Sequence, residues 1–355
     1  MQIIEDENTK ILKSLHYNYI FNKKNGFFAR WGATEDEDPD FSPFGPEIAD
    51  IEISSANASD IENKTDNMLI TEGGCPGACK KCYKSNHGKQ TIHMSLDTLK
   101  KILDKMPNVL QVAYGITGVD SHPQLFDILW ETRNRGIVPN ITIIPVNVTD
   151  EHCKKLSEVC GAVAVSIDDR FKEAGYNVIK KLSQDYGMSQ INIHIVLAED
   201  TIPFIRDVVN DMKSDNRLSS MNALVMLSFK DKANTNCYKP ITQKSYNKLV
   251  EFCEEMGIRF GFDSCGSKLY LEHIKGKENE ANLSRCVEPC ESLLYSCYIA
   301  HNGKMTCCSF LEGIEEEINI LDYDNIIDVW YSEKAKRWRN KLLQNKRNCP
   351  IYQIG

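Results

Sequence analysis

Cys75, Cys79 and Cys82 lie close together in a loop rich in glycine and proline, with three and then two residues between them. Thiolates are soft ligands that suit iron–sulfur clusters and zinc. Three such ligands leave one iron of a four-iron cluster without a protein ligand, open to an outside group. The glycines let backbone N–H groups approach the sulfur atoms, and the hydrogen bonds from these groups tune the reduction potential of the cluster. The spacing therefore predicts a metal centre that binds a further molecule.

Structural zinc is the alternative occupant of this loop. Zinc usually takes four ligands, often from paired C-x₂₋₄-C motifs, and His87 could supply the fourth. No second cysteine pair lies nearby in the sequence. An iron–sulfur cluster is therefore the preferred interpretation.

A second group of cysteines begins at Cys265, and it holds seven of the fourteen in the chain. A reducing compartment disfavours disulfides, so metal ligation is the leading explanation for so many thiols. The segment from residue 265 has a thin core, which a metal site would stabilise. Cys153, Cys160 and Cys253 lie in helical patterns and are expected to pack as small apolar side chains.

Alternating strands and helices must position these thiols. Apolar runs near 48–54, 108–115, 140–146, 161–168, 190–197, 221–229 and 258–264 favour strands. Helical patterns lie between them at 94–105, 122–135, 149–159, 170–184, 201–213 and 242–256. This order predicts βαβ units, a mainly parallel sheet and an α/β fold. The units are too few for a closed eight-stranded barrel and indicate an open or partial one.

Three regions are expected along the chain. Residues 1–47 contain an aromatic hairpin around Asn25-Gly26 and form a cap. Residues 48–264 form the partial (β/α)₆ barrel, with polar residues 55–67 as a surface insertion. Residues 265–355 form a small second domain with a hairpin at Asn302-Gly303 and a basic helix in 332–344.

The formal net charge of −8 gives no basic field, so duplex nucleic acid is not an expected partner. No run of about 18 apolar residues suits a membrane span. The charged N-terminus lacks the apolar stretch of a signal peptide. A cytoplasmic protein without a membrane partner is expected.

The C-x₃-C-x₂-C spacing, followed by Tyr83 and placed before the βα series, resembles the radical S-adenosylmethionine (SAM) superfamily. The resemblance implies that Cys75, Cys79 and Cys82 hold a catalytic [4Fe–4S] cluster. The amino and carboxylate groups of SAM would bind its fourth iron, and Tyr83 would lie beside the adenine. Reductive cleavage of SAM would give a 5′-deoxyadenosyl radical that takes hydrogen from a substrate.

The resemblance also implies further SAM contacts at the ends of the predicted strands: Gly115, Thr117, Gly118, Ser166, Asp168, Asn192 and His194. Other interpretations stay open for these residues. The glycines could serve turns, Ser166 and Asp168 could cap the next helix, and His194 could be a hydrogen-bonded core histidine.

The stretch Cys290-x₁₂-Gly303-x₄-Cys308 resembles the start of SPASM and twitch domains. It implies one auxiliary [4Fe–4S] cluster, for which we expect the ligands Cys265, Cys290, Cys308 and Cys349. Cys286, Cys297 and Cys307 are then surplus, either alternative ligands or packing residues. Zinc on the same four thiolates is the alternative.

Enzymes of this type mostly modify ribosomally made peptides, for example by crosslinking or epimerisation. A peptide substrate and an electron donor such as a flavodoxin or ferredoxin are the implied partners. Cys237, after the sixth strand, is a candidate hydrogen donor to a substrate radical. The alternatives are a radical SAM enzyme acting on a small metabolite, nucleoside or sugar, and a zinc-stabilised binding protein without catalysis.

Overall fold

A mainly parallel sheet organises the molecule. The structure is a computed structural model that describes residues 1–65, 68–79, 82–232, 237–352 and 354. Its largest sheet has ten strands in the order β14-β13-β12-β11-β10-β9-β5-β15-β16-β17. From β14 to β15 all neighbours pair in parallel. The strands are β5 (Ile48–Glu52), β9 (Gln111–Gly115), β10 (Val138–Ile143), β11 (Ala162–Ser166), β12 (Ile191–Leu197), β13 (Ala223–Ser228), β14 (Phe260–Phe262), β15 (Ser296–Ile299), β16 (Lys304–Thr306) and β17 (Ile318–Asn319).

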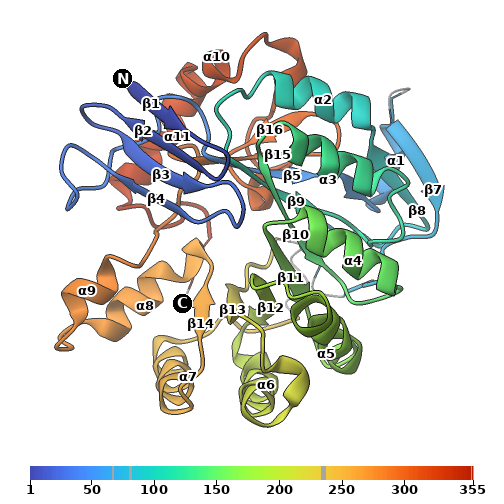
Figure 1. The fold of residues 1–355 in the computed structure, drawn as a ribbon, viewed down its shortest axis with the longest axis vertical. Coiled ribbons are helices and arrows are strands. Elements are labelled where there is room, and N and C mark those ends of the chain that lie inside the picture. The colour runs from blue at the N-terminus through green and yellow to red at the C-terminus, as the bar shows by residue number, and fades with distance from the viewer. Residues whose placement is uncertain (66–67, 80–81, 233–236, 353, 355) are drawn as a thin grey trace.

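Six helices lie along the outside of this sheet (Figure 1). They are α2 (Leu96–Asp104), α3 (Leu125–Asn134), α4 (Asp150–Val159), α5 (Lys172–Lys180), α6 (Ile202–Ser214) and α7 (Gln243–Glu255). The side-chain oxygen of Ser95 caps α2 by accepting from the Thr98 N–H, and Thr149 caps α4 in the same way. The predicted α/β class and parallel sheet are confirmed, and a π-helical turn, Lys181–Asp185, continues α5.

The two faces of the sheet differ in packing. On β12 the isoleucines at 191, 193 and 195 are buried, whereas Asn192 and His194 are half-buried. Alternate residues of a strand point to opposite faces, so the apolar set packs under the helices. Asn192 and His194 therefore lie on the inner face of the curved sheet.

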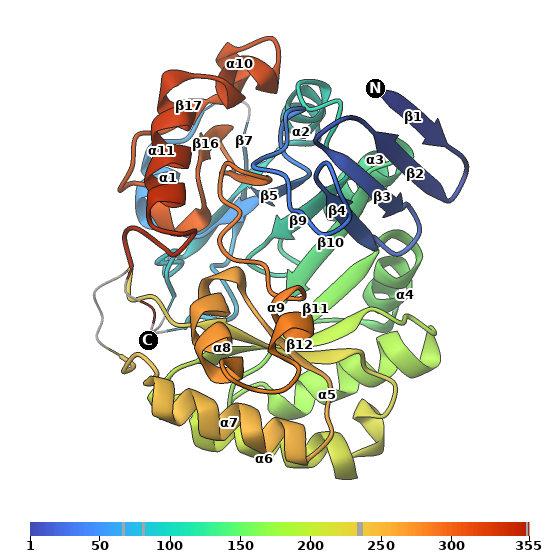
Figure 2. The same ribbon diagram turned by 90° about the vertical axis from the view of Figure 1, so that its left-hand side faces the viewer.

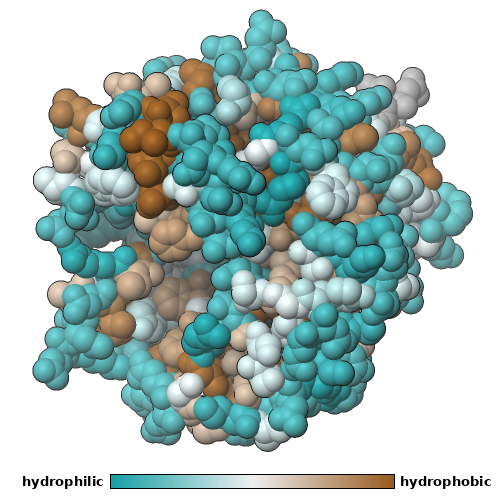
Figure 3. Space-filling view, in the orientation of Figure 1, coloured by the Kyte–Doolittle hydropathy of each residue, from teal (hydrophilic) through white to brown (hydrophobic). Residues whose placement is uncertain are grey.

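The N-terminal segment forms a separate four-stranded antiparallel sheet, in the order β1 (Gln2–Glu5), β2 (Thr9–Lys13), β3 (Asn18–Asn22) and β4 (Phe28–Trp31). The β3–β4 pair is the predicted hairpin, with Asn18 opposite Trp31. The two strands before it were not predicted. Figure 3 shows a surface recess below this sheet. It lies on the side toward α8 and α9, which are labelled in Figure 1.

A three-stranded antiparallel sheet holds the cysteine loop: β6 (Ser54–Ser55), β8 (Gln90–Met94) and β7 (Met68–Glu72) in that order. The loop leaves β7 after Glu72 and returns at Gln90, directly opposite. The prediction that 55–67 is a surface insertion needs correction at its start. Ser55 is fully buried in β6, and α1 (Ala58–Glu62) follows it.

The C-terminal extension continues the main sheet, because β15 pairs in parallel with β5. The predicted hairpin at Asn302-Gly303 joins β15 and β16, and Gly303 has a φ of 81°. The extension also contains α8 (Ser267–Ile274), α9 (Glu280–Ser284), α10 (Ile326–Trp330) and α11 (Glu333–Gln344), which Figure 2 shows from the side. The domain division at residues 264 and 265 stays a prediction. None of the helices described here is long and apolar enough to cross a membrane.

Candidate functional site

The loop of the cysteine triplet brings its sulfur atoms close to its own backbone. Gly77 lies next to two of these sulfur atoms. If it carried a Cβ atom, that atom would lie 3.3 Å from the Cys79 Sγ and 3.5 Å from the Cys75 Sγ. Burial raises the pKa of the Cys75 thiol, and the N–H groups of Gly77 and Ala78 act against this shift. Cys82 is half-buried like the other two. The loop therefore presents three thiols and N–H donors, a set that fits an iron–sulfur cluster.

The loop packs over the carboxyl end of β9. The Cys75 thiol lies 3.6 Å from the carbonyl oxygen of Thr117, which is buried. A Cβ on Gly118 would lie 3.0 Å from the Cγ of Pro76, so a larger residue would push the loop away. The structure thus brings two predicted SAM contacts, Thr117 and Gly118, to the triplet. Their role in SAM binding stays a prediction.

Arg170 ties the loop to the end of β11. Its guanidinium donates to the carbonyl oxygen of Gly77 at 2.8 Å and to the Cys79 Sγ at 3.4 Å. It also forms an ion pair with Asp168 at 2.7 Å. Sequence reasoning selected Asp168 but missed Arg170. Its position two residues after Asp168, at the end of a predicted strand, was the only available signal.

The remaining predicted SAM contacts lie on neighbouring strands. Gly115 is exposed at the end of β9, and Ser166 and His194 are register partners on β11 and β12. The Asn192 Oδ1 accepts from the Asn222 Nδ2 at 3.0 Å. Burial lowers the pKa of His194 to about 4, so the ring is neutral at pH 7.

Tyr83 points toward the C-terminal extension. Its ring stacks on Phe310, with centroids 4.2 Å apart and an interplanar angle of 21°. Burial raises the pKa of its hydroxyl to about 12. The predicted place of Tyr83 beside adenine is not tested by this contact, which occupies one face of the ring.

The four predicted auxiliary ligands converge although they come from distant segments. Cys290 lies close enough to Cys265, Cys308 and Cys349 for the charges of the thiolates to interact. Cys290 and Arg347 are joined by an N–H to carbonyl bond of 3.2 Å, which brings the C-terminal tail to this group. The structure therefore gathers these cysteines, while their role as ligands stays a prediction.

Each of these four thiols has a hydrogen-bond donor beside it. The backbone N–H of Tyr352 donates to the Cys349 Sγ at 3.2 Å. The other donors are the N–H of Ser292 for Cys290, the N–H of Phe310 for Cys308 and the ammonium of Lys230 for Cys265. Burial raises the pKa of Cys265 and of Cys308 to about 12, against these donors. Donors of this kind stabilise thiolates that carry a metal.

The remaining cysteines and His87 differ in their surroundings. Cys286 is exposed, and Cys297 is buried in β15. Cys307 is buried beside Cys308 and is also close enough to Cys290 for their charges to interact. Cys237 is half-buried after β13, and His87 is exposed. Among the described residues, no three His, Cys, Asp or Glu side chains are placed so that they could hold a single metal ion.

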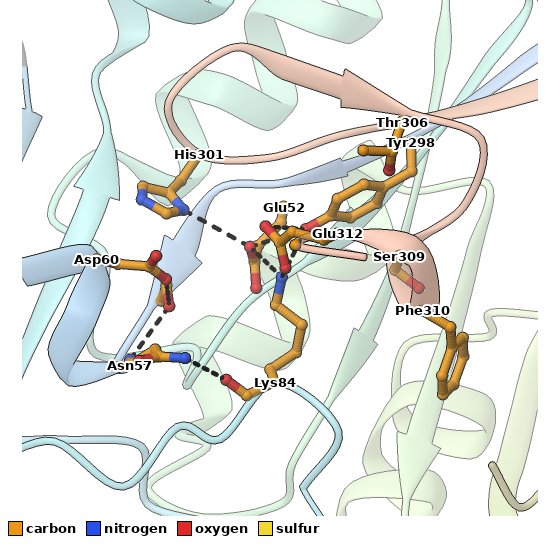
Figure 4. Close-up of polar contacts among 12 residues, drawn as sticks. Glu52, Asn57, Asp60, Lys84, Tyr298, His301, Thr306, Ser309, Phe310 and Glu312 are labelled. Carbon is orange, nitrogen blue, oxygen red and sulfur yellow. Dashed lines mark hydrogen bonds and ion pairs between the residues drawn. The ribbon is translucent and has the colours of Figure 1, made fainter. Parts of the chain in front are cut away.

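A buried polar network that sequence reasoning missed lies beside the triplet loop (Figure 4). The Lys84 ammonium is 2.9 Å from the Glu52 Oε2 and 2.8 Å from the Tyr298 hydroxyl, and it also bonds Glu312. His301 Nδ1 lies 3.6 Å from the Glu52 Oε2. No sequence motif marks these residues, because they come from β5, the loop and the extension.

Asp50 lies two residues before Glu52, on the same face of β5, between Ala113 and Tyr298 on the adjacent strands. The residue has a solvent-exposed surface, but the many protein atoms around it partly desolvate the carboxylate. This desolvation raises the pKa of Asp50 to about 6. Within the described part of the chain it has no hydrogen bond or ion pair. An acid in this position is poised to bind or accept a proton from a ligand.

We expect Asp50→Asn to stabilise the protein, and more at pH 8 than at pH 5.5. The folded pKa of Asp50 lies above its unfolded value near 3.9. The folded state therefore loses stability as pH rises through this range, and the full cost is present above about pH 6. Solvent screening reduces the gain. Thermal unfolding at both pH values measures it, with the exposed Asp207→Asn on α6 as control. An equal gain at both pH values would contradict this assignment.

The fold is that of radical SAM enzymes, as the sequence resemblance implies. SuiB from Streptococcus suis bound to S-adenosylmethionine aligns with a TM-score of 0.69 and 12% identity, over 94% of this chain and 89% of SuiB. SuiB bound to the precursor peptide SuiA aligns over the same shares, with a TM-score of 0.67 and 12% identity. At this identity the likeness concerns the fold.

Sequence comparison gives a shorter match. A tungsten-containing aldehyde ferredoxin oxidoreductase cofactor-modifying protein from Pyrococcus furiosus is 30% identical over 89 residues. The match spans 24% of this chain and 25% of that protein, so the chain matches about a quarter of its relative. No protein-family profile matches the chain.

Proposed function

We propose that this chain is a radical SAM enzyme that modifies a ribosomally made peptide. The observation that supports it most is the triplet loop, with three half-buried thiols over the carboxyl ends of parallel strands. Ligands of βα folds collect at this end of the sheet. The SAM-bound and peptide-bound structures of SuiB, which shares the fold, agree with both parts of the proposal.

Cys75, Cys79 and Cys82 would hold a [4Fe–4S] cluster, and the donors around them suit it. When bound, this cluster supplies the electron that cleaves SAM into methionine and a 5′-deoxyadenosyl radical. Arg170 holds the loop in place through the Gly77 carbonyl and the Cys79 sulfur. The Nδ1 of His194 lies 3.4 Å from the Thr142 Oγ1, so the neutral ring would offer its Nε2 to SAM or to the substrate without adding charge.

The inner face of the sheet suits a substrate of some size. Several of its positions carry small side chains, at Ala113, Gly115, Ala162, Ala164 and Ala223. Cys265, Cys290, Cys308 and Cys349 would hold an auxiliary [4Fe–4S] cluster at the border of this face. A flavodoxin or ferredoxin would supply electrons, and Cys237 is the candidate hydrogen donor.

Anaerobic reconstitution with iron and sulfide tests the proposal. We expect a brown protein with about seven to eight irons per chain that forms 5′-deoxyadenosine from SAM under reduction. Peptides encoded beside this gene should raise the rate and change in mass. A small metabolite that does so instead would replace the peptide assignment. Colourless protein with stoichiometric zinc and no SAM cleavage would refute the proposal.

A further inference from the structure

Two adjacent contacts join the triplet loop to the segment after Cys308. Tyr83 and Lys84 directly follow the triplet, and Phe310 and Glu312 lie two and four residues after Cys308. Tyr83 stacks on Phe310. Figure 4 shows the ion pair between Lys84 and Glu312. We call these four residues the clamp. It connects the two proposed metal sites through side chains that are not ligands.

The clamp is anchored to the main sheet. Lys84 also contacts Glu52 at the end of β5 and Tyr298 on β15, and the Tyr298 hydroxyl donates to the Glu52 Oε2 at 2.9 Å. The side chains of Lys84 and Glu52 are only 8% and 7% exposed. Lys232, 3.8 Å from Glu312, balances the second carboxylate. The position of Lys84 is therefore fixed by partners on every side.

Buried charges such as those of the clamp are a costly way to pack two segments together. Taking ions out of water is costly, and apolar side chains of the same volume often stabilise a protein as well or better. Removing one partner of such a network is strongly destabilising, because the other charge stays buried without compensation. A network of this kind favours one arrangement of its segments over others. Here the arrangement is that of the triplet loop against the segment after Cys308.

Each half of the clamp also reaches a proposed ligand through its own backbone. Tyr83 is bonded directly to Cys82, and the N–H of Phe310 donates to the Cys308 sulfur. A displacement of Phe310 therefore changes both the stack on Tyr83 and the hydrogen bond to Cys308. The stack and the ion pair come from neighbouring residues, Tyr83 and Lys84, so both belong to one contact between the sites and loss of either one weakens it.

We propose that the clamp couples the two metal sites, so that filling one strengthens metal binding at the other. This rests on the two-site assignment of the proposed function. Coupling between binding sites is reciprocal, so a filled auxiliary site must protect the triplet site, and the reverse. Lys84 and Phe310 are positioning residues in this scheme.

The test is a cycle of variants in the reconstituted full-length protein, with Cys308→Ala and Lys84→Met alone and combined. The readout is the rate at which a ferrous chelator removes iron from the triplet site. This rate is measured as the decay of the electron paramagnetic resonance signal that changes when SAM is added. We expect Cys308→Ala to speed this loss about tenfold or more when Lys84 is present. In the Lys84→Met background the same change should add little. Phe310→Leu should act like Lys84→Met. Because it leaves no buried charge without a partner, it replaces Lys84→Met in the cycle if that variant fails to fold.

Arg339→Met is the matched control. Arg339 is another buried cation of the extension, and its bonds go to the carbonyl oxygens of Leu293 and Trp330, away from the loop. It should lower stability without changing the effect of Cys308→Ala on the triplet site. Equal effects of Cys308→Ala with and without the clamp would overturn the coupling. If the wild-type chain binds no SAM-responsive cluster, the proposed function fails instead.

Discussion

Alanine at Cys75, Cys79 and Cys82 together is expected to reduce 5′-deoxyadenosine formation to background while about half of the iron stays bound. The three thiols are the only cysteines of the loop, and each lies within the segment that Arg170, Pro76 and Gly118 hold over the strand ends. Without them no ligand set remains there for a cluster that binds SAM. Iron analysis and chromatography of SAM products measure both quantities on the same sample.

The fold should survive this change. The loop is held by the β7–β8 pairing and by the Arg170 bond to the Gly77 carbonyl, and neither requires the thiols. Cys153→Ala, a buried cysteine of α4 outside both groups, should keep full iron and full SAM cleavage. Unchanged SAM cleavage in the triple variant would refute the assignment of the triplet.

The sequence was informative where local patterns determine structure. Apolar runs such as 190–197 form strands because alternate side chains pack under helices, and this yields the parallel sheet. The Asn25-Gly26 and Asn302-Gly303 turns predict their hairpins for a similarly local reason. The two N-terminal strands escaped prediction because β1 is exposed along its whole length and β2 buries only Leu12, so neither carries an alternating apolar pattern.

The parts of the site that escaped prediction depend on contacts between distant segments. Lys84 and Glu312 are 228 positions apart, and nothing local distinguishes them from surface charges. Arg170 acts on a loop 91 positions earlier. Asp50 lies in a strand whose neighbours, Ala113 and Tyr298, become visible only in the sheet. The triplet was predictable because its chemistry lies within eight residues.

We expect Cys265→Ala and Cys349→Ala each to lose about half of the iron and to lower the melting temperature by several degrees. The four cysteines join the end of β14, the start of the hairpin, its exit and the tail after α11. Such a site closes long loops, so its metal contributes to the free energy of folding. Iron analysis and thermal unfolding under anaerobic conditions measure both effects.

Cys286→Ala provides the matched control, because Cys286 lies in the same extension but is exposed and is not one of the four predicted ligands. It should keep its iron and its melting temperature. If neither Cys265→Ala nor Cys349→Ala changes the iron content, the auxiliary ligand set is wrong. Zinc bound in place of the lost iron fraction would instead assign these thiolates to zinc. Since the triplet keeps its own ligands, some 5′-deoxyadenosine should still form in both variants, which separates loss of this site from loss of the fold.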